Sequence, residues 1–195
     1  MKDMGKIMGT LKQKYSESLD KKRENAVQAS LGYVKIADSE LSGESFNLLQ
    51  SAMDEIVTFM DEPLLIQYNN KPQNLYTLIK MNFQDKASRV QLVPSKTEIN
   101  VTFGFTKNEK IKVLSKDKET NQIITGIPIK LESSKNISSV SGVTDTNGRL
   151  VLPLPKFDFF ETRKQIILSI DFIGMKLSPN SFPKIPINII INAPI

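Results

Sequence analysis

The sequence SGVTDTNGRLVLPL (residues 141–154) combines a tight turn with a strand of alternating residues. Leucine occupies every second position from Leu150 to Leu154, which is the period of a strand with one buried face. The residues before it favour a turn, because Gly adopts positive φ and Asp or Asn bonds its own backbone two residues on. We therefore interpret Thr144, Asp145, Asn147 and Gly148 as a structural turn between two strands.

A calcium-binding loop is the main alternative for this turn. If Gly148 held the glycine position of an EF-hand, the first and last positions of the loop would fall on Val143 and Leu154. Neither side chain can bind a metal ion, so an EF-hand is excluded. A looser carboxylate site would have only Asp145 nearby. The sequence predicts no metal and no cofactor.

The same two-residue period recurs through residues 91–195. Apolar and polar residues alternate in segments that turn signals separate, as expected for half-buried strands. About seven such strands within roughly 100 residues predict an antiparallel immunoglobulin-like sandwich. The predicted strands are Ile99–Phe105, Lys110–Leu114, Ile127–Leu131, Ser139–Val143, Arg149–Leu154, Ile166–Phe172 and Ile187–Ile191.

Residues 1–90 show a helical period instead. Apolar residues at steps of three or four predict one helix from about Lys12 to Leu41 and another from Phe46 to Met60. Ser42-Gly43 breaks the chain between them, and Ser42 is a candidate N-cap. A short strand at 64–68, a turn and a short third helix follow, and Pro94-Ser95 is the predicted linker. The predicted fold class is α+β: a helical hairpin region (1–90) followed by an all-β sandwich (91–195).

The composition argues against an enzyme. The 195 residues contain no His and no Cys, which removes the usual near-neutral general base, the thiol nucleophile and the commonest transition-metal ligands. The carboxylate pairs Asp54-Glu55 and Asp61-Glu62 lie in and after the second predicted helix, where a solvated polar face is the expected interpretation. No phosphate-binding glycine motif and no serine triad is supported. No stretch reaches about 18 apolar residues, so the sequence predicts no membrane span.

Positive charge is concentrated in the second half of the chain. Residues 1–90 hold twelve basic and twelve acidic side chains, whereas residues 91–195 hold fourteen and nine, which gives the net charge of +5. Part of this excess forms a possible contact surface of Lys107, Lys110, Lys112, Lys116 and Lys118. Asn, Glu and Asp lie among these lysines and no aromatic residue does, which favours a solubilising role over nucleic-acid binding.

A short aromatic run is the second possible contact surface. Phe157, Phe159 and Phe160 fall in a predicted loop, where they either plug the core or join Tyr68 and Tyr76 in an aromatic platform for carbohydrate. Plugging of the core is the favoured interpretation.

Two stretches resemble known bacterial families. Residues 126–154 resemble bacterial immunoglobulin-like and carboxypeptidase-regulatory-like modules, through Gly126, Pro128, Thr144, Asp145 and Gly148. That resemblance implies a fold and a spacer or adhesion role. Residues 15–75 are similar to envelope lipoproteins of the LPP-twenty type, in which two helices, a D-E-P stop and a short strand precede an immunoglobulin-like module. The matching residues are Tyr15, Lys22, Arg23, Ala26, Leu49, Ala52, Asp61, Glu62 and Pro63.

The lipoprotein resemblance shapes the expected function. It implies that the chain is the C-terminal part of a longer lipoprotein of the bacterial cell envelope, since the leading domain and the lipobox cysteine of that family are missing. We expect a non-catalytic binding or scaffolding protein with a protein or cell-envelope partner. Without this resemblance, the chain has no visible export signal and would be cytoplasmic.

Two alternatives remain open. Residues 2–15 resemble the helical tail domain of the amidotransferase B-subunit family, which is implicated in handling tRNA, through Asp3, Met4, Gly5, Lys6, Met8 and Gly9. The first alternative is therefore a nucleic-acid-linked accessory protein that uses this helix and the lysine-rich hairpin. The second is a non-catalytic carbohydrate-binding module of a surface enzyme.

Overall fold

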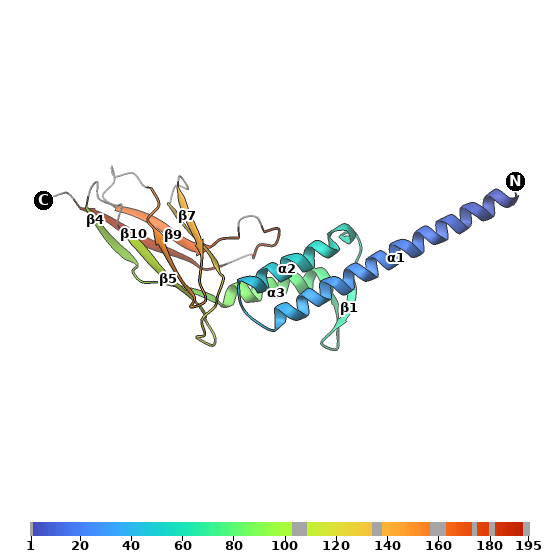
Figure 1. Ribbon diagram of the computed structural model, residues 1–195, viewed down its shortest axis with the longest axis horizontal. Coiled ribbons are helices and arrows are strands. Elements are labelled where there is room, and N and C mark those ends of the chain that lie inside the picture. The colour runs from blue at the N-terminus through green and yellow to red at the C-terminus, as the bar shows by residue number, and fades with distance from the viewer. Residues whose placement is uncertain are drawn as a thin grey trace.

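The computed structural model describes residues 2–102, 109–133, 138–156, 163–172, 175–179 and 182–192. Its helices lie at one end of an elongated molecule and its two larger β-sheets at the other, and the N-terminal part of the first helix projects beyond both (Figure 1). The fold is therefore a mixed α+β fold, as the sequence predicts at this level.

Three α-helices form the helical end: α1 (Lys2–Asp38), α2 (Gly43–Ile56) and α3 (Leu75–Arg89), with a short 3₁₀ helix, η1 (Val57–Phe59), after α2. The helix α1 begins ten residues earlier than the sequence analysis predicts, at Lys2 instead of about Lys12. The prediction was too short because it followed the apolar stripe from Leu19 onwards. Residues 2–11 contain two glycines but no proline, and a helix that has already formed continues through them.

Side-chain caps fix where α2 and α3 start. Ser42 Oγ accepts a hydrogen bond from Ser45 N (3.3 Å), and Ser45 Oγ accepts one from Ser42 N (3.1 Å). This reciprocal pair satisfies backbone donors that a helix start leaves open, and it confirms Ser42 as the N-cap. At α3 the cap is one-sided, since the Asn74 side chain accepts a hydrogen bond from Thr77 N (3.3 Å).

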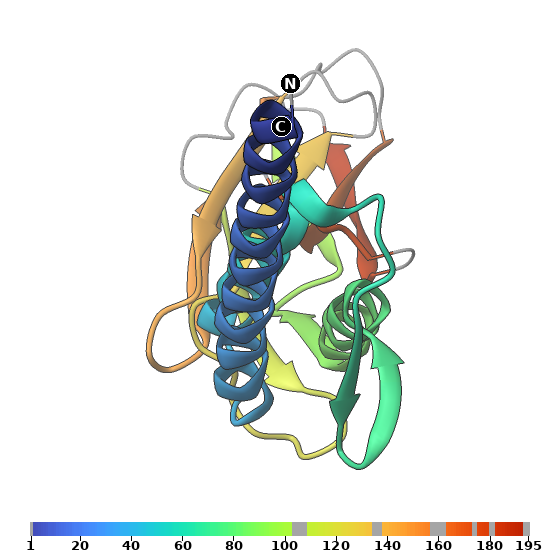
Figure 2. The ribbon, with the colours of Figure 1, turned by 90° about the vertical axis from the view of Figure 1, so that its right-hand side faces the viewer.

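A hairpin separates α2 from α3. Its strands, β1 (Leu65–Tyr68) and β2 (Lys71–Asn74), pair antiparallel, and Asn69 and Asn70 both have positive φ at the tip. Two consecutive left-handed residues define the tight turn that suits a two-residue hairpin. The hairpin leads directly into α3 (Figure 2). The sequence predicts β1 and the turn but not β2, which is short and contains Pro72.

The remaining strands form two sheets. The three-stranded sheet has the order β3-β5-β8, with β3 (Val90–Pro94), β5 (Lys110–Asp117) and β8 (Arg149–Pro153) antiparallel. The five-stranded sheet has the order β4-β10-β9-β6-β7. Its strands are β4 (Glu98–Thr102), β6 (Pro128–Ser133), β7 (Ser139–Val143), β9 (Arg163–Ile170) and β10 (Lys184–Asn192).

Two details differ from the sequence-based expectation. First, β4 pairs parallel with β10, so the sheets are not wholly antiparallel. β3 and β4 follow each other closely in the chain but belong to different sheets. β4 therefore lies beside β10 and not beside β3, its neighbour in the chain. Second, Pro94 is the last residue of β3, and Ser95 just after it donates its N–H to Lys112 O of β5 (2.8 Å), so this pair lies at the end of the first strand of the sheets instead of linking helices to sheets. The alternation of buried residues already begins at Val90 and Leu92.

One continuous core joins the helices to the sheets. Phe46 of α2, Phe83 of α3 and Phe172, which follows β9, form an aromatic cluster with ring centroids 5.1 to 5.9 Å apart. Residues 175–179 lie against the helices, where Leu177 N donates to Gln50 Oε1 (2.8 Å) and Lys176 Nζ contacts Asp54 Oδ1 (3.1 Å). The contacts of Phe172, Lys176 and Leu177 therefore join the sheets to the helices.

Candidate functional site

The turn that the sequence analysis singles out is satisfied by its own hydrogen bonds. Asp145 Oδ1 accepts from Asn147 N (2.8 Å) and from Arg149 N (2.9 Å), and Gly148 has φ +70°. A carboxylate that bonds the backbone two and four residues on stabilises a tight loop without any ligand. These contacts agree with a structural role for Thr144, Asp145, Asn147 and Gly148. In the described part of the chain, no group of three or more Asp or Glu side chains could hold a metal ion.

Thr144 ties the turn to both sheets. Its hydroxyl oxygen accepts a hydrogen bond from Ile127 N (2.8 Å) and lies within hydrogen-bond distance of Ser115 Oγ (3.1 Å), and both Thr144 and Ser115 are buried. Ser115 Oγ donates to Ile124 O (2.6 Å). The buried hydroxyl pair therefore connects β5, the segment before β6 and the turn before β8.

Only three of the five lysines in the predicted contact surface are shown to share one side of a strand. Lys110, Lys112 and Lys116 alternate along β5 on the side that faces away from the core, whereas Lys118 lies in the turn that follows the strand. Lys107 lies outside the described residues. The structure adds Arg149, which pairs with Leu114 from the neighbouring strand β8 and is also exposed. We call Lys110, Lys112, Lys116 and Arg149 the basic sheet face.

Apolar side chains lie between these cations. Val93 of β3 pairs with Leu114 of β5, and Val151 of β8 pairs with Lys112. Val151 is 50% exposed. Together these residues line a shallow hollow of about 320 Å³ on the outer side of the three-stranded sheet. The sequence alone could not bring Arg149 and Val93 to Leu114, because the three strands are distant along the chain.

The most conspicuous surface that the sequence analysis missed is on α1. Between residues 4 and 19 of this helix six large apolar side chains are exposed, from Met4 (72% exposed) through Tyr15 (69%) to Leu19 (39%). They follow one another at helical steps of one, three or four residues and face one side of the helix. We call Met4, Ile7, Met8, Leu11, Tyr15 and Leu19 the α1 stripe.

The α1 stripe continues into the part of α1 that the protein itself covers. Steps of three or four residues lead from Leu19 through Lys22 to Ala26, Ser30 and Val34. Ser30 and Val34 are buried against α2, and Ser30 Oγ donates to Ala52 O (2.8 Å). Arg23 Nη1 contacts Glu62 Oε2 (3.0 Å) just after α2 and η1, which marks the end of the covered part. The signal that could have found the stripe was the apolar spacing before Leu19.

The ionisable side chains near the junction of helices and sheets form hydrogen bonds and ion pairs within the protein. Burial lowers the pKa of Lys86, whose Nζ donates to Glu40 O (2.9 Å), and Arg89 pairs with Asp117 at the end of β5. Burial, followed by the hydrogen bond to Asp38 and its negative charge, raises the pKa of Tyr68 to about 12. A polar cavity of about 300 Å³ brings acids and bases together, and its charged lining residues are Asp38, Glu40, Lys86, Arg89 and Asp117.

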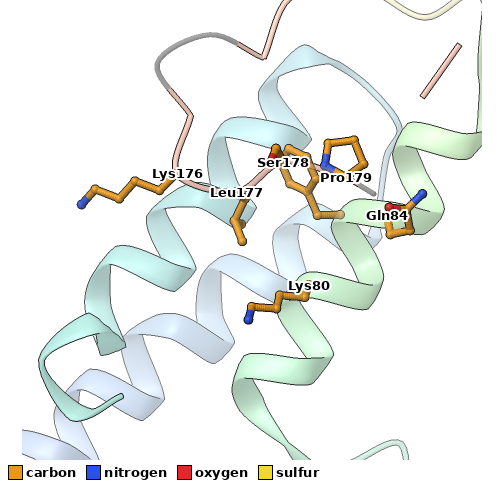
Figure 3. Close-up of a pocket in the computed structure, with 7 residues that line it drawn as sticks. Lys80, Gln84, Lys176, Leu177, Ser178 and Pro179 are labelled. Atoms are coloured by element: carbon orange, nitrogen blue, oxygen red, sulfur yellow. The ribbon is translucent and has the colours of Figure 1, made fainter. Parts of the chain in front are cut away.

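The other candidate residues do not converge on a site. Asp54 pairs with Lys176, and Glu62 pairs with Arg23. A hollow of about 250 Å³ beside α3 is lined by the segment that follows Phe172; Figure 3 shows Leu177 pointing between α2 and α3, with Lys80 and Gln84 on the α3 side. This hollow is part of the joint between helices and sheets.

Of the five residues in the predicted aromatic platform, only Tyr68 and Tyr76 lie in the described part of the chain. The hydroxyl of Tyr68 donates to Asp38, and that of Tyr76 donates to Ile56 O (3.2 Å), so both tyrosines are held against the helices. Phe157, Phe159 and Phe160 lie outside the described residues.

No family of known proteins matches the sequence, and no curated protein matches it. Among solved structures, the crystal structure of the apo-form Calx CBD1 domain is similar to 55% of this chain and 100% of its own, with 11% identical residues and a TM-score of 0.30. A similarity of this size establishes neither a shared fold nor a shared function. Within the described residues, no helix is long and apolar enough to cross a membrane.

Proposed function

We propose that this chain is a non-catalytic binding and scaffolding protein of the bacterial cell envelope, and that the α1 stripe is its main contact surface. In this proposal α1 is an arm: its C-terminal half is anchored on α2, and its N-terminal half holds a helix of another protein.

The α1 stripe is the observation that carries the proposal. An exposed Leu or Met contributes about 1.5–3 kcal/mol when a partner buries it fully, and six such residues share one side of a projecting helix. Scattered exposed apolar residues are normal, but a contiguous row marks an interaction surface. Because the row continues the side that α2 covers, a partner helix would extend a packing arrangement already present in this protein.

The sheets supply a second part of the proposal, an immunoglobulin-like sandwich. Two facts support it: β3 to β10 divide into a three-stranded and a five-stranded sheet, and the consecutive strands β3 and β4 belong to different sheets. Immunoglobulin-like sandwiches likewise divide their strands between two sheets that pack face to face. In such sandwiches inward-facing residues alternate with outward-facing ones along each strand. The two sheets here would be β3-β5-β8 and β4-β10-β9-β6-β7. In this proposal the sandwich acts as a spacer, which is a role that the resemblance of residues 126–154 implies.

The envelope location rests on the resemblance of residues 15–75 to envelope lipoproteins and on the module-like motif at 126–154. Cell fractionation of the native host with an antibody to this chain tests it. Recovery in the envelope fraction supports the location, and recovery in the soluble cytoplasmic fraction contradicts it.

Photocrosslinking in the native host tests the contact surface itself. A photoreactive residue replaces Leu11 in the α1 stripe, and a matched variant carries it at Gln13, which lies on the opposite side of the same helix turn. We expect a discrete crosslinked product from position 11 and none from position 13. Equal labelling at both positions, or none at either, contradicts a specific contact through the stripe.

A further inference from the structure

We propose that the outer side of the three-stranded sheet binds an extended, acidic segment of another protein. The proposed site consists of the basic sheet face together with Val93, Leu114 and Val151, and it is independent of the α1 stripe. In its ligand, residues with carboxylate side chains would alternate with small residues. One apolar side chain would replace a carboxylate at the position opposite Leu114.

The spacing of the cations along β5 suggests the extended form of the ligand. Residues two apart on one side of a strand lie about 6.7 Å apart, so Lys110, Lys112, Leu114 and Lys116 form a straight row. A second extended chain places its alternate side chains at the same interval. Its matching pattern is acidic, acidic, apolar, acidic at every second residue.

Every charged side chain that the described strands place on this side of the sheet is positive. The outward residues of the three strands are Gln91, Val93, Lys110, Lys112, Leu114, Lys116, Arg149, Val151 and Pro153, and none of them is acidic. Asp117, the acidic residue at the end of β5, is buried and pairs with Arg89. Glu119 also contacts Arg89, with 3.4 Å between its Oε2 and Arg89 Nε. Four cations therefore face solvent together, which attracts an anionic partner.

The apolar centre selects the kind of anion. Val93, Leu114 and Val151 line the hollow between the cations, and the nine outward residues include no aromatic side chain on which bases could stack. A phosphate backbone would place charge over this apolar centre. An acidic protein segment instead offers one apolar side chain there and carboxylates around it, which satisfies both kinds of residue.

Fluorescence anisotropy with a labelled synthetic peptide tests the proposal. The probe is acetyl-Gly-Glu-Ser-Glu-Ser-Leu-Ser-Glu-Gly-amide, and the competing probes are polyuridylate and vesicles of phosphatidylglycerol. A peptide of the same composition with the order Leu, Glu, Glu, Glu at the alternate positions controls for register. We expect the first peptide to bind at least about fivefold more tightly than the reordered one, since the latter places its leucine against a lysine. Increasing salt should weaken the binding.

The matched protein variants carry the same change in charge at different places. Lys112→Glu with Arg149→Glu reverses two cations of the site, whereas Lys35→Glu with Lys71→Glu reverses two exposed lysines of the helical part. We expect the first pair to weaken peptide binding by about tenfold or more and the second pair by less than about twofold. Circular dichroism checks that both fold.

Three results would overturn the proposal. The peptide fails to bind the parent protein, both variant pairs weaken binding equally, or the two peptides bind equally well. Tighter binding of polyuridylate would support a nucleic-acid surface instead, and tighter binding of the vesicles would support a lipid surface.

Discussion

Gly43 occupies a position where no side chain fits. It starts α2, its N–H donates to Thr125 O (2.9 Å), and a Cβ built on it would lie 1.7 Å from the carbonyl oxygen of Gly126. We expect Gly43→Ala to lower the free energy of unfolding by about 3 kcal/mol, because helix and loop must separate. Gly9→Ala, which meets nothing within 4 Å, should change it by less than about 1 kcal/mol. Chemical denaturation measures both, and equal effects would contradict the close contact.

Asp117 makes the junction sensitive to acid. Burial alone would raise its pKa, but hydrogen bonds from Glu119 N (2.8 Å) and from Arg89 outweigh burial and hold the pKa of Asp117 below its usual value. Such a carboxyl contributes stability above the pKa of the unfolded chain, about 3.9, and loses it as the pH falls through the lower folded-state pKa. We expect Asp117→Asn to cost about 3 kcal/mol at pH 7. Urea denaturation should show this difference narrowing below about pH 4; a constant difference would exclude the ion pair as its cause.

At the scale of elements, the sequence predicted most strands and helices but not their partners. The alternation in β5, β6, β8, β9 and β10 has a period of two because one side of each strand is buried, so each could be located locally. The parallel pairing of β4 with β10 joins residues about ninety positions apart, and no local pattern encodes it. For the same reason the lysines of β5 were found, whereas Arg149 and Val93 beside them were not.

The two halves of α1 should respond differently to substitution. Met8 is 59% exposed in the α1 stripe, whereas Val34 is fully buried. We expect Val34→Ala to cost about 2 kcal/mol of stability and Met8→Ser less than about 0.5 kcal/mol. Thermal denaturation of the isolated protein measures both. A large loss for Met8→Ser would mean that the stripe belongs to this protein's own core and is not a surface for a partner.

The whole molecule should unfold as one unit, because Phe172 packs with Phe46 and Phe83 and so links the sheets to the helices. We expect far-ultraviolet circular dichroism, to which helices and strands both contribute, to give the same denaturation midpoint as the fluorescence of the four tyrosines, all of which lie within residues 1–90. Phe172→Ala should lower the free energy of unfolding by about 3–5 kcal/mol, and both probes should report the same loss. Two separate transitions in the parent protein would show that helices and sheets are stable independently.

Hydrogen exchange of the amides from Met4 to Leu19 tests the role of the α1 stripe most directly. The protein isolated from its native host under conditions that preserve complexes is compared with the same chain produced alone. An unpacked helix opens with little cost, whereas packing against a partner protects its amides. We predict fast exchange in the chain alone and at least about hundredfold slower exchange in the native preparation. Equally fast exchange in both would contradict a partner on the stripe.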